Sequence, residues 1–152
     1  MDCISSLQEV HEMSLLLPDQ LNCSAKRMFE YLCDSKGFRL TRSVCKPSEF
    51  GNVQITAACE EFGVEYRVDR GDESVFVVVE GTEYLVEDAM RLAGDAHCAR
   101  SNTRDEEAWL CSHVDSLREI LRKDRLASSK QGLEQSRIER LHKMFPGGVV
   151  GG

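Results

Sequence analysis

The stretch that decides the fold runs from Ile55 to Cys98 and reads ITAACEEFGVEYRVDRGDESVFVVVEGTEYLVEDAMRLAGDAHC. Apolar and charged residues alternate over 64–69, which predicts a strand with one buried face and one solvated face. Residues 75–79 are almost all β-branched, which predicts a second strand that is more fully covered. Gly71 lies between these segments and can supply the positive φ of a tight turn. The stretch therefore predicts a β-hairpin at the centre of the fold.

Helices are predicted on both sides of the hairpin. Apolar residues recur at helical spacing from about Asn52 to Phe62, and Gly63 ends that pattern. Thr82 is the predicted N-cap of a helix whose apolar residues repeat at three and four positions up to residue 96. Only a short helical turn fits between Pro47 and the helix that begins near residue 52.

Residues 38–44 read as a further strand. The alternation places Phe38, Leu40, Arg42 and Val44 on one face and Arg39, Thr41 and Ser43 on the other. With the hairpin strands over 64–69 and 74–80, the segment predicts an α+β domain over residues 38–99. Its expected core consists of Leu40, Ile55, Phe62, Val64, Tyr66, Val77, Val79, Leu85, Ala89 and Leu92.

Helical extensions are predicted before and after this domain. In residues 1–37 we expect a helix over 5–17 and a second one with Ser24 as N-cap and Gly37 as the C′ residue. Residues 100–145 open on the capping box Thr103–Glu106 and end in a helix over 131–144, and residues 146–152 form a flexible tail. The first C-terminal helix carries an apolar stripe that a small sheet would leave uncovered, so we predict a partner or homodimer contact through Trp109, Leu110, Val114, Leu117 and Leu121.

Composition limits the classes of function. The net charge is −7, yet residues 114–152 hold eight Lys and Arg against five Asp and Glu, so the rest of the chain is strongly acidic. An acidic domain repels a phosphate backbone unless its basic residues cluster. The seven cysteines lack zinc-knuckle spacing, so we predict reduced thiols and no metal or cofactor. Without an apolar run of about 20 residues or a secretory signal, we expect a cytoplasmic or nuclear protein that does not bind membranes.

The predicted order from 38 to 98, β-α-α-β-β-α, resembles the type I K-homology (KH) domain. The resemblance is carried by Gly63, the strand that follows it, the run 75–79, Gly81, Val86, Ala89 and Leu92. It implies a three-stranded antiparallel sheet with helices packed on one face. KH domains that bind single strands place a Gly-x-x-Gly loop between their first two helices, where the nucleic-acid backbone approaches closely.

The corresponding loop here is Glu49-Phe50-Gly51-Asn52, which keeps one glycine of the pair and places an acidic residue beside the phosphate path. The resemblance thus implies a degenerate KH-like scaffold that serves as a protein-interaction module. The residues predicted to contact nucleic acid, if it is bound, are Arg39, Arg42, Lys46, Phe50, Gly51 and Asn52.

Three interpretations of function remain open at this point. The leading one is a non-enzymatic scaffold or adaptor module of an RNA-regulatory complex. The first alternative is direct binding of single-stranded RNA through a divergent KH groove. The second is a cysteine protease of a polyprotein that ends in Gly-Gly, although no cysteine lies in a recognisable nucleophile signature.

Overall fold

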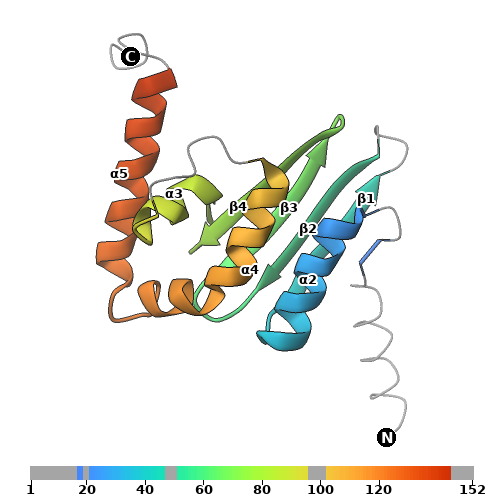
Figure 1. The fold of residues 1–152 in the computed structure, drawn as a ribbon, viewed down its shortest axis with the longest axis horizontal. Helices are drawn as coiled ribbons and strands as arrows, with labels where there is room; N and C mark the ends of the chain where they lie inside the picture. Colours follow the sequence, from blue (N-terminus) through green and yellow to red (C-terminus); the bar gives the residue numbers. More distant parts are fainter. Residues whose placement is uncertain (1–16, 19–20, 47–50, 96–101, 145–152) are drawn as a thin grey trace, which may run out of the picture.

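The computed structural model describes residues 17–18, 21–46, 51–95 and 102–144 of the chain (Figure 1). The strands are β1 (Arg39–Lys46), β2 (Asn52–Ala58), β3 (Gly63–Asp69), β4 (Asp72–Val79) and β5 (Thr82–Leu85). The helices are α2 (Cys23–Ser35), α3 (Val86–Leu92), α4 (Thr103–Ile120) and α5 (Leu126–Met144). The predicted α+β class is confirmed. Residues 5–16 of the helix predicted over 5–17, the residue Phe50 and the tail 146–152 lie outside the described residues.

The five strands form one antiparallel meander in the order β1-β2-β3-β4-β5. The predicted central hairpin is confirmed, since Val64 pairs with Val77. Each of the turns β3–β4 and β4–β5 contains two residues with positive φ. The φ values are 53° at Arg70 and 87° at Gly71 in the first turn, and 49° at Glu80 and 81° at Gly81 in the second. Such turns match the right-handed twist of the flanking strands, so they hold both hairpins in register.

The helix predicted over 52–62 is wrong, because residues 52–58 form strand β2. Val53, Ile55 and Ala57 are buried at every second position, and β2 pairs with a strand on each side. The helix predicted from Thr82 is also displaced: residues 82–85 form β5, and α3 begins at residue 86. Within the described residues the sheet therefore has five strands, and the three-stranded KH-like packing is not confirmed.

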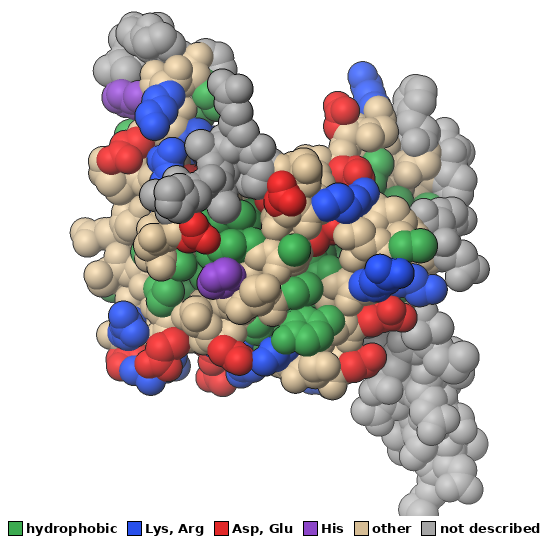
Figure 2. Space-filling model, in the orientation of Figure 1, with side chains coloured by type: hydrophobic (Ala, Val, Ile, Leu, Met, Phe, Trp, Pro, Cys, Tyr) green, Lys and Arg blue, Asp and Glu red, His purple; other side chains and the backbone are tan. Residues whose placement is uncertain are grey.

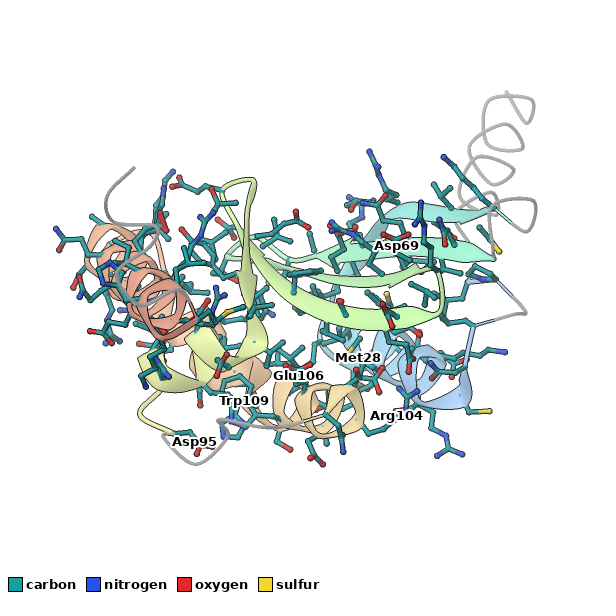
Figure 3. All side chains as sticks on the ribbon, turned by 90° about the horizontal axis from the view of Figure 1, so that it is seen from above. Met28, Asp69, Asp95, Arg104, Glu106 and Trp109 are labelled. Carbon is teal, nitrogen blue, oxygen red and sulfur yellow. The ribbon has the colours of Figure 1, made fainter. Side chains whose placement is uncertain are left out.

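The helices in the described part of the chain cover one face of this sheet. Seen from above, α2 and α4 lie on the same side of the strands, where the labelled Met28 and Trp109 are found (Figure 3). Helix α3 packs against α5 and against β4 and β5. We call the helix-covered side the inner face and the opposite side the outer face.

One hydrophobic core joins the inner face to the helices and extends from Leu21 to Leu133. Seven of the ten predicted core residues are buried in it: Ile55, Phe62, Val64, Tyr66, Val77, Val79 and Ala89. Leu40, Leu85 and Leu92 are half-buried. Leu85 pairs with Phe76 and lies on the outer face, opposite to the side that α2 and α4 cover.

The apolar stripe of α4 belongs to this core. Its five residues are between 0% and 7% exposed: Trp109, Leu110, Val114, Leu117 and Leu121. The interpretation of this stripe as uncovered surface is therefore wrong. A five-stranded sheet and α2 provide the covering area that a three-stranded sheet would lack.

Polar side chains fix the helix ends at other residues than predicted. Asn22 caps α2 by accepting a hydrogen bond of 2.8 Å from the Ala25 amide, in place of Ser24. Asn102 caps α4 in the same way, one residue before the predicted box. Gly37 follows α2 with φ 73°, as predicted. None of the helices in the described part of the chain has both the length and the apolar character that a bilayer span requires.

Candidate functional site

The outer face of the sheet is a surface that neither α2 nor α4 covers. Strand register places Arg42, Thr56, Glu65, Phe76 and Leu85 in one row across all five strands. Polar residues are expected where an antiparallel sheet faces water. The half-buried apolar residues in this otherwise polar surface are Phe76, Val78 and Leu85 on β4 and β5, and Val44 on β1.

A β-bulge places three basic residues together on the outer face. The register shifts between Leu40 and Arg42, so Arg39, Arg42 and Lys46 lie opposite Ala58, Thr56 and Asn52, which are alternate residues of β2. Without the bulge, Arg39 and Arg42 would lie on opposite faces, as their spacing predicted. All three side chains are exposed.

A chain of polar contacts crosses the outer face from β1 to β5. Arg42 Nη1 donates to Gln54 Oε1 at 3.2 Å, and Gln54 Nε2 donates to Glu65 Oε2 at 3.2 Å. Arg67 donates to both Glu65 and Glu83, and its guanidinium lies 4.9 Å from the Phe76 ring centroid. Burial raises the pKa of the Glu65 carboxyl, and the adjacent Arg67 opposes that shift.

These contacts neutralise Arg67 but leave positive charge on β1. The bonding partner of Arg42 is a neutral amide, and Arg39 makes no ion pair within the described ranges. Strands β1 and β2 contain three basic residues and no acidic one. Beyond them, the outer face carries Glu65, Asp69, Asp72 and Glu83 against Arg67. The face is therefore positive at its β1 edge and acidic towards β5.

The helix side shows no such separation of charge. Figure 2 shows positive and negative side chains interspersed there among hydrophobic ones. The exposed large hydrophobic residues within the described ranges are Tyr31, Ile138 and Met144, which lie on different helices or at a helix end. Scattered apolar residues of this kind are normal for a protein surface.

Two hollows on the outer face share the lining residues Thr41, Thr56, Val78 and Gly81, and we call them together the outer-face groove. One hollow, of about 420 Å³, lies beside Arg42 and Arg67. The other, of about 500 Å³, extends to Leu121 and Leu126 at the α4–α5 connection. The second hollow exists because the residues beneath it are small: Ala58 pairs with Gly63, which has no side chain, and Gly63 pairs with Val78.

The residues of the predicted Gly-x-x-Gly position have a structural role here. Gly51 has φ 68° and immediately precedes β2, so the segment connects two strands and not two helices. Asn52 Oδ1 accepts a hydrogen bond of 2.9 Å from the Arg70 amide at the β3–β4 turn. The structure thus brings Asn52 to a turn, while Arg39, Arg42 and Lys46 share the outer face.

A second polar cluster, on the helix side, was not predicted from the sequence. Tyr66 donates to Glu73 at 2.5 Å, and Arg104 donates to Glu73 and Glu107 at 2.9 Å each. Burial, together with Glu73, raises the pKa of the Tyr66 hydroxyl. Burial alone would raise the pKa of the Glu73 carboxyl. Hydrogen bonds from Tyr66, Arg104 and Asn22 outweigh this effect and hold its pKa below the usual value. The cluster ties α2 and α4 to the hairpin, since each member bonds to another.

Three of the five described thiols are in surroundings that disfavour the thiolate form. Burial raises the pKa of Cys33, Cys59 and Cys111, which keeps these thiols protonated. Cys59 lies in the groove and its thiol points at the carboxylate of Glu61 and the Phe62 carbonyl, each 3.5 Å away. Within the described ranges, no group of three or more His, Cys, Asp and Glu residues is placed to hold a metal ion.

Comparison of the chain with family models, with curated protein sequences and with solved structures found no match. The candidate site therefore rests on its own geometry.

Proposed function

We propose that the chain is a non-enzymatic protein-interaction module that binds its partner on the outer face of the sheet. The observation that carries this proposal is that α2 and α4 lie on the same side of the sheet, while two hollows that share four lining residues lie on the other side and at its β2–β3 end. A protein interface characteristically combines an apolar centre with a polar rim. Phe76, Val78 and Leu85 supply such a centre, and the charged residues of β1, β3 and β5 supply the rim.

A phage-displayed library of random peptides tests this proposal. The groove-filling variant Ala58→Trp should reduce binding of the selected peptides about tenfold or more, since anchoring contacts carry most of the energy of an interface. The matched control Gln131→Trp adds the same side chain to an exposed position of α5 and should leave binding unchanged. Failure to select any peptide, or equal binding by Ala58→Trp and the wild-type chain, would contradict the proposal.

Direct RNA binding is the second candidate, favoured by the common face of Arg39, Arg42 and Lys46. Acidic residues of β3, β4 and β5 share that face, and the chain carries a net charge of −7. We therefore expect a labelled pyrimidine-rich single strand to bind with a Kd of roughly 10⁻⁴ to 10⁻⁶ M at about 0.15 M salt, as in non-specific binding. Saturable nanomolar binding that Arg39→Glu abolishes would make RNA the leading candidate.

A further inference from the structure

The outer-face groove follows strand β2 between two walls of side chains. In a flat sheet, β1 and β5 would lie about 19 Å apart, which is four strand spacings. One hollow is nevertheless lined both by Arg42 of β1 and by Glu83 of β5, so the side chains of the two edge strands enclose a concave surface. Along β2, this hollow is lined by Gln54 and Thr56 and the other hollow by Thr56 and Ala58, so the groove runs in the strand direction.

The floor of the groove offers no backbone groups to a partner. Each of the strands β2, β3 and β4 is hydrogen-bonded to a neighbouring strand on both sides. A segment that is buried on this floor must therefore satisfy its own N–H and C=O groups, because unpaired buried backbone groups are unfavourable. An α-helix does so within itself, and its diameter of about 10–12 Å is smaller than the separation of the two edge strands.

The two walls differ in charge. On the β1 side, Arg39 makes no ion pair within the described ranges, and Arg42 is bonded to a neutral amide. On the β5 side, Glu65 and Glu83 share the guanidinium of Arg67, so acidic groups are in excess there. A helix that complements both walls carries carboxylates on one flank and basic side chains on the other.

We propose, on the basis of the protein-interaction function above, that the partner supplies an amphipathic α-helix that lies in the outer-face groove along β2. Its apolar stripe packs on the half-buried Phe76 and Val78. Its acidic flank contacts Arg39 and Arg42, and its basic flank faces Glu83. Strand β2 has seven residues and is thus about 23 Å long, a length that a helix of about 15 residues matches.

Fluorescence anisotropy with the full chain tests this proposal, using three labelled helical peptides of about 15 residues that share one leucine stripe. The mixed peptide has Glu along one flank of the stripe and Lys along the other, and the other two have Glu or Lys along both flanks. The wild-type chain should bind the mixed peptide most tightly. Equal binding of the mixed and the all-Glu peptides would overturn the basic flank.

Charge reversal on β1 should change this preference. The double variant Arg39→Glu/Arg42→Glu should weaken binding of the mixed peptide about tenfold or more and strengthen binding of the all-Lys peptide. The control Arg137→Glu/Lys143→Glu makes the same charge change on exposed residues of α5 and should leave all affinities within about twofold. Equal effects of the two double variants would overturn the contact with β1.

A proline substitution separates a helix from an extended segment. Proline at a central, solvent-facing position of the mixed peptide breaks its helix, whereas alanine at the same position does not. The proline peptide should therefore lose about tenfold or more in affinity, and the alanine peptide should bind like its parent. Equal binding by both would overturn the helix.

The remaining outcomes separate this proposal from the proposed function. If none of the three helical peptides binds but library peptides do, and Ala58→Trp prevents their binding, the amphipathic helix is wrong and the proposed function stands. If neither class of peptide binds, both proposals fail. If the mixed peptide binds Ala58→Trp as tightly as the wild-type chain, it lies outside the groove and the helix proposal fails.

Other occupants of the groove give their own results. Self-association of the wild-type chain in sedimentation velocity, with Ala58→Trp monomeric, would replace the partner helix by a second copy of the chain. A pyrimidine-rich RNA that binds more tightly than the mixed peptide, and that Arg39→Glu/Arg42→Glu releases, would overturn the helix in favour of RNA.

Discussion

The carboxyl of Glu106, in the first turn of α4, has an unusually high pKa. Burial, together with the nearby Glu87, Glu107 and Asp105, raises its pKa to about 7. A pKa that is higher in the folded chain than in the unfolded chain stabilises the fold at low pH. That stability is lost as the pH rises through about 7.

Glu106→Gln should therefore stabilise the fold relative to the wild type at pH 8 and change stability little at pH 5. The expected difference between the two pH values is about 1–3 kcal/mol in the free energy of unfolding. Urea denaturation at both pH values measures it, and Glu30→Gln on the exposed side of α2 is the control. An equal effect of Glu106→Gln at pH 5 and pH 8 would show that the carboxyl titrates normally.

Asp88 is fully buried in α3 and holds α5 in place. It accepts hydrogen bonds from Ser136 Oγ at 2.8 Å and from Arg140 Nη2 at 3.1 Å. Arg140→Ala would leave this carboxylate buried without its cation, and we expect a loss of about 2–4 kcal/mol in the free energy of unfolding.

Arg137→Ala is the matched control for that substitution. Arg137 lies three residues earlier on the same helix and pairs with the exposed Glu134, so its loss should cost about 0–0.5 kcal/mol. Chemical denaturation measures both variants. Equal costs for the two substitutions would contradict the role assigned to the buried pair.

At the scale of elements, α4 supplies much of the core through Leu117, which is 0% exposed. Leu117→Ala should cost about 2–5 kcal/mol in the free energy of unfolding, while Ile138→Ala on the exposed face of α5 should cost little. Denaturation measures the stability, and light scattering follows the mass. If Leu117→Asp instead lowers the mass and leaves the chain folded, the stripe of α4 is an interface after all.

The sequence predicts strands best where alternation and turn residues agree, as in the β3–β4 hairpin. It fails at β2 and the turn that follows, where Ala57, Ala58, Glu60 and Glu61 favour a helix on local propensity. Pairing of β2 with strands on both sides overrides that preference, and a single segment does not reveal such pairing. At β5, Thr82 resembles a helix cap, but the positive φ values of Glu80 and Gly81 turn the chain into another strand.

In the molecule as a whole, the sequence identifies several residues of the candidate site but not how the sheet brings them together. Their place in or just after the first predicted strand singled out Arg39, Arg42 and Lys46, yet their common face depends on a bulge, which breaks the alternation on which the strand prediction rests. The contacts of Arg67 with Glu65 and Glu83 join β3 to β5, so they require the register of the sheet. Sequence spacing predicts neighbours along one element but not across a five-stranded meander.

A partner bound at the outer face of the sheet should protect the turns that line the outer-face groove. Backbone amide hydrogen exchange of the full chain, with and without a peptide selected from the displayed library, measures this protection. We predict slower exchange in residues 59–61 and 80–81 when the peptide is bound, with α2 unchanged. Unchanged exchange in these turns at saturating peptide, or protection confined to the helices, would contradict the proposed function.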